Sequence, residues 1–225
     1  MGILDLFRKK IPVPETVFTP SREAKGSWQA FESKLLHKSL ILLVVGRRGS
    51  GKTSLGFRML ELFHWKTKKK CHVLGYERVH LPSWIKKVNA VEDARMNSVV
   101  LIDEGALAFS AREPMRDVNK TIGKIMAVAR HRGLTLIFIS QSSAMIDVNV
   151  LRLVDVLLLK EPSLLQAKFE RKALREIYDD VRDSFKNLEK SEQHVFVYDD
   201  DFQGLVQYGL PLFWKDEVSR SYKNV

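Results

Sequence analysis

Short runs of consecutive apolar residues recur along the chain and are separated by longer segments. Five such runs lie at residues 40–45, 71–74, 98–103, 134–139 and 154–159. A continuous apolar run of this length is typical of a strand that is buried on both faces, as in a parallel sheet covered by helices. The runs therefore predict an α/β fold with a mostly parallel central sheet flanked by helices.

Three of the intervening segments place apolar residues three and four positions apart, which is the spacing of one helix face. The predicted faces are Leu55, Met59, Leu62 and Phe63; Val118, Ile122, Ile125, Met126 and Ala129; and Leu174, Ile177, Tyr178, Val181 and Phe185. In the second segment, Ser110 and Glu113 form a capping-box pattern at the start, and Gly133 follows the basic last turn. The third segment is predicted to open at Pro162.

The remaining segments give weaker signals. Residues 11–26 contain three prolines and predict an extended arm, 28–38 a short helix, and 64–70 a basic turn. Residues 75–97 are predicted to be irregular, with one helix starting at 82–84. Residues 194–198 and 202–208 flank Asp199–Asp201 and predict a C-terminal β-hairpin, followed by a last helix with Trp214, Val218 and Tyr222 on one side. We expect an N-terminal arm and short helix (1–39) and one main domain (40–225).

Residues 46–53 fit the pattern G-x-x-x-x-G-K-[ST] of a phosphate-binding loop, directly after an apolar run and before a helical face. Glycines allow such a loop to turn its N–H groups around a polyphosphate, and the helix N-terminus favours an anion. Lys52 is predicted to reach the β- and γ-phosphates, and the Thr53 hydroxyl to hold Mg²⁺. The predicted ATP-binding residues are Gly46, Arg47, Arg48, Gly49, Ser50, Gly51, Lys52 and Thr53.

Two further motifs end apolar runs, at the sheet edge where an α/β protein binds its ligands. Asp103 follows a buried run and is predicted to hold Mg²⁺. The neighbouring Glu104 can polarise a water for attack on the γ-phosphorus, which indicates hydrolysis. Gln141 follows the run at 134–139 and is predicted to contact the γ-phosphate or the water. The transition state also needs positive charge, for which the candidate arginine fingers are Arg112, Arg116, Arg130 and Arg132.

The composition of the chain indicates which kinds of partner and covalent link are possible. The 225 residues include 37 Lys and Arg against 27 Asp and Glu, a net charge of +10 that favours a polyanionic partner. Lys66, Lys68–Lys70 and the loop at 142–150 are candidates for DNA contact, although the lysines also suit a solvated helix end. The single cysteine, Cys71, excludes an intrachain disulfide and is expected to be a small core residue. No apolar run approaches the length of a membrane span.

The loop at 46–53, the motif at 99–104 and the segment at 129–141 together resemble the FtsK–HerA superfamily of DNA-pumping ATPases. The resemblance covers about residues 40–160. Within the superfamily, the chain resembles the genome-packaging ATPases of tailless, often membrane-containing icosahedral viruses. The segment 129–141 is also similar to the zonula-occludens-toxin-like ATPases of filamentous phages. Those phage proteins carry a membrane span, and the lack of one in this sequence favours packaging.

The resemblance implies an ATPase that uses ATP and Mg²⁺ to translocate double-stranded DNA through a homo-oligomeric ring, commonly a hexamer. It also implies a portal or capsid-vertex membrane protein as partner, and a location in the host cytoplasm or at the packaging vertex of the virion. The alternative is a toxin-like ATPase that drives phage assembly or export at a membrane. A nucleoside kinase and a non-hydrolysing P-loop switch are disfavoured by the Asp103–Glu104 pair.

Overall fold

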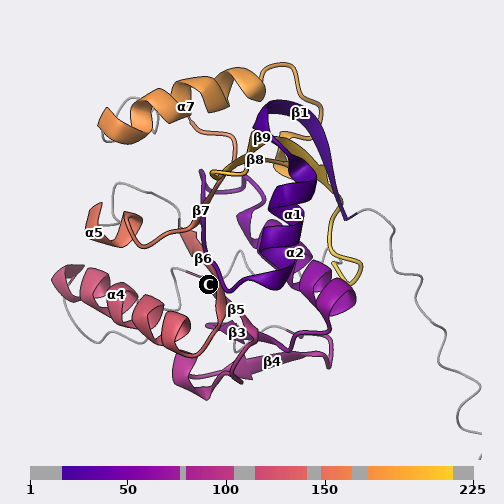
Figure 1. Cartoon of the computed structure of the whole chain (residues 1–225). Coiled ribbons are helices and arrows are strands. Elements are labelled where there is room, and N and C mark those ends of the chain that lie inside the picture. Colours follow the sequence, from indigo (N-terminus) through magenta and orange to yellow (C-terminus); the bar gives the residue numbers. More distant parts are fainter. Residues whose placement is uncertain (1–16, 77–79, 104–114, 141–147, 164–171, 215–225) are drawn as a thin grey trace, which may run out of the picture.

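The computed structural model describes residues 17–76, 80–103, 115–140, 148–163 and 172–214, and within them nine strands form one sheet (Figure 1). The order across the sheet is β1-β9-β8-β7-β2-β6-β5-β3-β4. The strands β7, β2, β6, β5, β3 and β4 are mutually parallel, and β8, β9 and β1 join antiparallel. The bounds are β1 Phe18–Gly26, β2 Ile41–Val45, β3 Cys71–Leu74, β4 Ile85–Val88, β5 Val99–Asp103, β6 Thr135–Ser140, β7 Val156–Leu159, β8 His194–Tyr198 and β9 Phe202–Tyr208.

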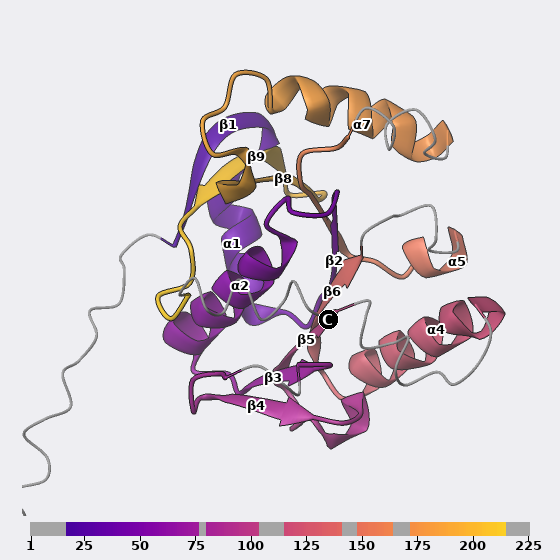
Figure 2. The same cartoon turned by 180° about the vertical axis from the view of Figure 1, so that it is seen from behind.

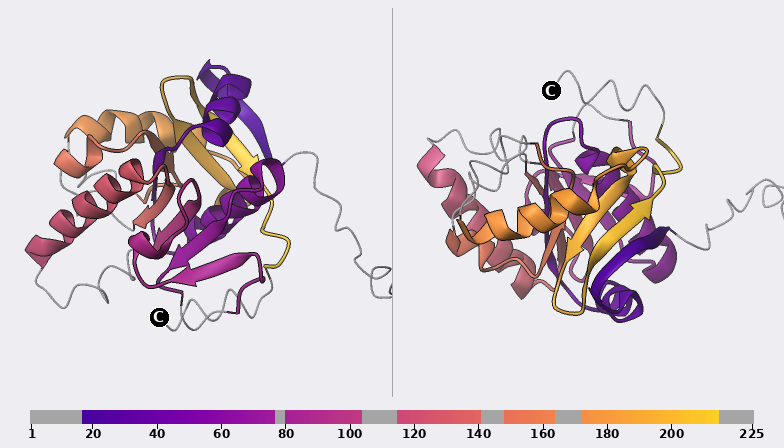
Figure 3. Two further views of the ribbon diagram at one scale, coloured as in Figure 1. Left: turned by 60° about the horizontal axis from the view of Figure 1, so that its bottom comes forward. Right: turned by 90° about the horizontal axis from the view of Figure 1, so that it is seen from above.

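Helices cover both faces of this sheet. Figures 1 and 2 show α1 and α2 on one face and α4, α5 and α7 on the other. Figure 3 shows α7 lying over the hairpin of β8 and β9, where Tyr178, Phe196 and Leu205 belong to one buried cluster. The bounds are α1 Trp28–His37, α2 Lys52–Thr67, α4 Met115–His131, α5 Val148–Leu151 and α7 Lys172–Ser184, with 3-10 turns η2 Val91–Asp93 and η4 Ser191–Gln193.

The strand β2 shows why a strand that is covered by helices on both faces is apolar at every position. Leu42 and Val44 belong to the cluster that α1 and α2 cover, whereas Ile41, Leu43 and Val45 belong to the cluster under α4 and α7. Successive side chains of a strand point to opposite faces, so a strand covered on both sides cannot alternate with polar residues. The two-sided burial confirms the predicted α/β architecture. The antiparallel pairing of β8 with β9 confirms the predicted C-terminal hairpin.

The helix α2 is more deeply buried than the sequence predicted. Its expected face was Leu55, Met59, Leu62 and Phe63, but every residue from Ser54 to Phe63 is buried. The sheet lies on one side of the helix, and the segment after β9 covers another, where the Leu212 N–H donates to Glu61 Oε1 at 2.8 Å. The helix also continues to Thr67, so the predicted basic turn at 64–70 is confined to residues 68–70.

Two edge strands were not predicted. The second half of the expected arm forms β1, which pairs antiparallel with β9, and its Pro20 is tolerated because β1 lies at the sheet edge. The prediction of a helix that starts at 82–84 is wrong, because Ile85–Val88 forms the strand at the opposite edge of the sheet, β4. Ile85 is buried whereas Lys86 and Lys87 are exposed. Because Ile85 and Val88 are three positions apart, their spacing in the sequence is also that of a helical turn.

Other predictions fall partly or wholly outside the described residues. These include the first ten residues, the capping box at Ser110 and Glu113, the DNA-contact loop at 142–147 and the last helix beyond Trp214. The helix predicted to open at Pro162 is described only as α7 from Lys172, since Pro162 and Ser163 are not helical and residues 164–171 lie outside the described ranges. The division of the chain at residue 39 stays a prediction, although β1 and the C-terminal hairpin share one sheet. None of the helices in the described ranges is both long and apolar enough to span a bilayer.

Candidate nucleotide site

The predicted phosphate loop connects β2 to α2 in a conformation that needs glycine at two positions. Gly49 and Gly51 have φ angles of 79° and 85°, in the left-handed region that other residues rarely adopt. A Cβ atom at Gly51 would also lie 2.4 Å from the carbonyl oxygen of Glu192, so this glycine is fixed by close contact as well. The carbonyl of Gly51 then accepts from the Leu55 N–H at 3.0 Å, which starts α2.

The side chain of Lys52 folds back across the loop. Its Nζ donates to the carbonyl oxygens of Gly46 at 2.8 Å and Arg47 at 3.0 Å, and the residue is only 8% exposed. Beside it, the Ser50 Oγ is buried and has no hydrogen-bond partner in the described part of the chain. A cation and an unsatisfied hydroxyl at a helix N-terminus fit the oxygens of a bound polyphosphate.

The side chains of the two arginines inside the loop, Arg47 and Arg48, contact a neighbouring segment or are exposed to solvent. The Arg47 guanidinium forms an ion pair with Glu161 at 2.9 Å, and Arg48 is exposed. Although partial burial opposes the effect, bonds from the Ser191 hydroxyl and from Arg47 lower the pKa of the Glu161 carboxyl. Arg47 therefore tethers the loop to the segment after β7. Direct nucleotide contact by Arg47 or Arg48 side chains stays a prediction.

The strand order brings the second motif close to the loop. Only β6 separates β2 from β5, and its last residue Ser140 pairs with Val45 while Ile139 pairs with Asp103. The Tyr76 hydroxyl donates to Asp103 Oδ2 at 3.2 Å, and the Tyr76 ring packs edge-on against Phe57 of α2, with 5.2 Å between centroids. Asp103 is thus held at the carboxyl end of the sheet, beside the helix that begins with Lys52 and the half-buried Thr53.

Several predicted site residues cannot be placed. Glu104, Gln141 and Arg112 lie outside the described residues, although Glu104 directly follows β5 and Gln141 directly follows β6. Arg116 lies in α4, within the part of that helix whose side chains are not described.

Arg130 and Arg132 lie at the opposite end of the strands from their own phosphate loop. Arg130 Nη2 donates to the Leu153 carbonyl at 2.8 Å and to Asp155 Oδ1 at 3.2 Å, while Asp155 Oδ2 accepts from the N–H of Ile41, where β2 begins. Arg132 Nη2 donates to the Ala94 carbonyl at 2.7 Å, ahead of β5. A role for either at a neighbouring subunit's nucleotide stays a prediction.

The sequence did not point to Lys160 and Tyr208, which lie against the loop. Lys160 directly follows β7, and a Cβ atom at Gly46 would lie 2.5 Å from its Cβ. Tyr208 ends β9, and its hydroxyl lies 3.1 Å from the Gly51 carbonyl oxygen. The sequence signal that could have identified Lys160 is its position, because a charged residue there directly follows the apolar run at 154–159.

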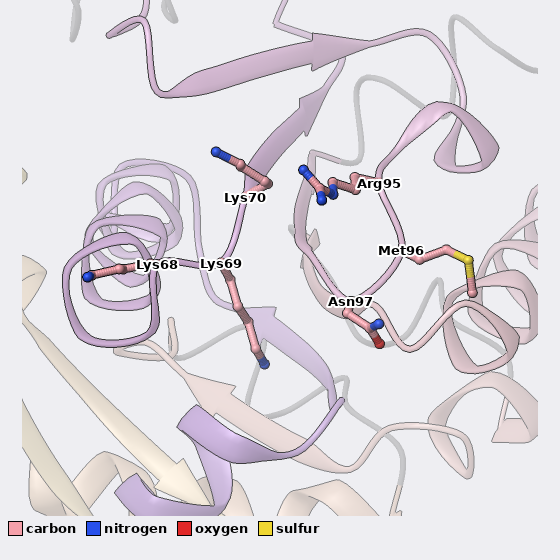
Figure 4. A pocket seen from close by; sticks show the side chains of 6 residues that line it. All are labelled: Lys68, Lys69, Lys70, Arg95, Met96 and Asn97. Atoms are coloured by element: carbon pink, nitrogen blue, oxygen red, sulfur yellow. The ribbon is translucent and has the colours of Figure 1, made fainter.

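A basic hollow of about 470 Å³ lies at the amino ends of β3 and β5, far along the strands from the phosphate loop (Figure 4). We use this name for the surface lined by Lys68, Lys69, Lys70, Arg95, Met96 and Asn97. In Figure 4, Arg95 points towards the wall that carries Lys70, and Lys68 extends away from Arg95. The four cations of the hollow suit an anion, and none of the described residues that line it is a predicted catalytic residue.

Comparison with solved structures places this geometry in a known fold. The chain is similar to the genome packaging NTPase B204 from Sulfolobus turreted icosahedral virus 2, in its complex with sulfate, with a TM-score of 0.53 and 16% identity over 77% of this chain and 98% of that chain. The same NTPase in complex with AMPPCP gives a TM-score of 0.52 and 16% identity, over 77% and 99% of the two chains. The fold is that of a P-loop NTPase.

A further similar structure is B204, the DNA-packaging ATPase from Sulfolobus turreted icosahedral virus, with a TM-score of 0.52 and 15% identity over 77% of this chain and 98% of that chain. No family model and no curated protein matches the sequence. At these identities the likeness concerns the P-loop NTPase fold, and it agrees with the sequence resemblance to viral packaging ATPases.

Proposed function

We propose that this protein binds and hydrolyses ATP with Mg²⁺ and uses the energy to move double-stranded DNA, as a motor that packages a viral genome. The observation that carries the nucleotide part is the loop from Gly46 to Gly51, with its two left-handed glycines and Lys52 folded across it. The similar fold of viral packaging NTPases and the net charge of +10 support the DNA part.

The residues have separate roles in this proposal. The loop N–H groups and Lys52 bind and orient the β- and γ-phosphates. Thr53 and Asp103 are the ligands for Mg²⁺, which neutralises charge on the phosphates when it is bound. Glu104 accepts a proton from the attacking water, and Gln141 hydrogen-bonds the γ-phosphate or that water. Tyr76 restricts Asp103 to one orientation through its hydroxyl.

Two substitutions test the nucleotide chemistry. Lys52→Ala should lose ATP affinity or turnover, because the cation that faces the phosphates is removed. Glu104→Gln should still bind ATP but lose turnover, since an amide cannot act as a base. Phosphate release and ATP binding are measured for both, with the exposed Lys124→Ala and Glu92→Gln as matched controls. Hydrolysis by Glu104→Gln at the wild-type rate would show that Glu104 is not the base.

The basic hollow is the surface that we propose for contact with the DNA backbone. Within the described residues, Lys68, Lys69, Lys70 and Arg95 have no carboxylate within the 4.0 Å of an ion pair. The walls are fixed by backbone bonds, from the Val99 N–H to Lys70 at 2.9 Å and from the Asn97 N–H to Arg132 at 3.1 Å. Unpaired cations on a fixed backbone suit phosphates of any base sequence.

The test compares two double variants that remove the same charge. Lys70→Gln with Arg95→Gln changes the hollow, whereas Arg22→Gln with Lys25→Gln changes exposed cations on β1, at the other edge of the sheet. If both hollow residues contact phosphates, the slope of log affinity against log salt should become shallower by about 1.8 for the first variant only. Equal DNA affinity and salt slope in the two variants would remove the hollow from the proposal.

The alternative function is a zonula-occludens-toxin-like ATPase that drives phage assembly or export at a membrane. The segment 129–141, which carries that similarity, contains the whole of strand β6. The two functions differ in the effect of DNA on turnover. Stimulation of ATP hydrolysis by double-stranded DNA supports packaging, while stimulation only by a membrane protein partner supports export.

The proposal includes a homo-oligomeric ring, of six subunits in the simplest case, acting with a portal or capsid-vertex membrane protein. The ring is inferred from the family resemblance and from Arg130 and Arg132, which lie at the opposite end of the strands from their own phosphate loop. Mass measurement of the purified protein with ATP and DNA tests it.

A further inference from the structure

We propose that Lys160 and Tyr208 are positioning residues for the phosphate loop, which they connect to the turn that precedes β8. They act through the Gly51 carbonyl and through residue 192. This inference rests on the proposed function, because it concerns how the loop is held ready for ATP.

Lys160 is completely buried yet fully provided with hydrogen-bond acceptors. Its Nζ donates to the Glu192 carbonyl at 2.8 Å, to the His194 carbonyl, and to the Tyr208 hydroxyl at 2.7 Å. Its backbone N–H donates to the Val45 carbonyl at 2.8 Å, immediately before the loop. Burying a lysine ammonium group is costly unless each of its three protons is accepted, and three acceptors meet that need here.

Tyr208 continues the network from Lys160 to the loop. It is 2% exposed, and its oxygen lies 3.1 Å from the Gly51 carbonyl oxygen and 2.9 Å from that of Glu192. A hydroxyl has one proton. Because Lys160 already donates to the Tyr208 oxygen, that proton remains available for the Gly51 or Glu192 carbonyl. The amine therefore orients the hydroxyl towards the loop and the turn.

The contacts converge where the loop becomes a helix. The Gly51 carbonyl accepts from the Leu55 N–H and from the Ser54 hydroxyl at 2.9 Å, and the Tyr208 hydroxyl lies within hydrogen-bond distance of it. The missing side chain of Gly51 leaves room for the Glu192 carbonyl. Residue 51 has the left-handed conformation that sets the direction of the following N–H groups, which bind phosphate in a loop of this kind. Fixing its carbonyl fixes those donors.

Burial lowers the pKa of Lys160, the charge of Lys52 acts in the same direction, and Glu192 and Glu161 oppose it. An apolar side chain would fill the same space without this cost. In some proteins, a buried polar group that is not needed for packing serves to specify one geometry. Here the specified geometry is the contact between the loop, the end of β7 and the C-terminal hairpin.

The test removes one hydroxyl from the network. Tyr208→Phe keeps the ring and its packing, and Tyr178→Phe is the matched control, because Tyr178 is equally buried but lies on α7, across the sheet. Binding of Mg·ATP, kcat, KM and the thermal midpoint are measured for both variants and the wild type. Tyr208→Phe should bind ATP about three- to tenfold more weakly, as expected for one hydrogen bond, with a raised KM and a nearly unchanged kcat. Tyr178→Phe should keep the wild-type affinity.

A role in stability alone would lower the thermal midpoint without changing the affinity of the folded protein. Lys160→Met should weaken ATP binding further. If this variant does not fold, the comparison of Tyr208→Phe with Tyr178→Phe still tests the inference. Equal ATP affinity of Tyr208→Phe and wild type overturns the inference while leaving the proposed function intact. Failure of the wild type itself to bind ATP overturns the proposed function and the inference with it.

Discussion

Cys71 shows how completely this core excludes solvent. Its side chain is 0% exposed at the start of β3, and its thiol donates to the Leu60 carbonyl of α2 at 3.4 Å. Burial raises the pKa of the thiol from 9.0 to about 12. The thiolate is the reactive form, so both access and ionisation protect this cysteine in the folded protein.

We therefore predict that iodoacetamide does not label the native protein at pH 8 but labels it stoichiometrically in denaturant. Between pH 9 and 12, the folded state keeps a thiol proton that the unfolded state loses. Stability should consequently fall with rising pH, by about 1.4 kcal/mol per unit for this group, relative to Cys71→Ala. Full labelling of the protein at pH 8 with its tertiary structure intact would contradict the prediction.

The residues of the site differ in how far sequence alone could identify them. The phosphate loop was predicted because its residues are contiguous and their chemistry depends on local conformation. Asp103 was predicted because it ends a buried strand, and parallel strands share a carboxyl edge. Lys160 and Tyr208 were not, because Tyr208 lies 157 residues from Gly51 and meets it only through the order of the strands.

At the scale of elements, α2 contains an ion pair that is buried between the sheet and the segment after β9. Arg58 Nη1 lies 2.5 Å from Glu61 Oε2, with side chains 6% and 2% exposed. Glu61 Oε1 also accepts from the Leu212 N–H. Burial raises the pKa of Glu61, and the bonds from Arg58 and Leu212 oppose that rise. Each charge depends on the other for compensation.

We predict that Arg58→Met destabilises the protein by about 3–5 kcal/mol, because it leaves the Glu61 charge buried without a partner. The double variant Arg58→Met with Glu61→Gln should recover part of that loss, since the amide oxygen still accepts from Leu212. Urea unfolding measures both. A single variant within about 1 kcal/mol of wild type would show that solvent reaches this pair.

The elements that sequence missed are both at the edges of the sheet. Runs buried on two faces predicted β2, β3, β5, β6 and β7, because strands between two helical layers consist mostly of apolar residues. The edge strand β4 has one neighbour and two exposed lysines, and β1 contains a proline. Pairing of β1 with β9 joins residues up to 190 positions apart, as between Phe18 and Tyr208, and no local pattern encodes that distance.

On the scale of the whole molecule, the two ends of the parallel strands carry different chemistry. The carboxyl ends hold the phosphate loop and Asp103, whereas the amino ends hold the basic hollow together with Arg130 and Arg132. Each of these two arginines has acceptors in its own chain, far along the strands from its own loop. Any contribution they make to hydrolysis therefore requires a second subunit.

The last prediction concerns that second subunit. We predict that a trans-acting arginine, one of Arg112, Arg116, Arg130 and Arg132, completes the active site of a neighbour. Such an arginine is worth about 10³–10⁵ in rate, whereas a cation that only complements a helix end is worth about 0.3–1 kcal/mol. Each is changed to alanine, with Arg182→Ala as control, because Arg182 is exposed on α7 and pairs with Asp179 of the same helix.

The decisive variant should bind ATP, lose nearly all hydrolysis, and regain some when it is mixed with Lys52→Ala protein. In the mixture, its intact phosphate loop meets an intact arginine from the neighbouring Lys52→Ala subunit. If the arginine acted within its own chain, neither partner in the mixture would contain a complete site and activity would stay absent. Hydrolysis within a few-fold of wild type in all four variants would show that no trans-acting arginine lies among them.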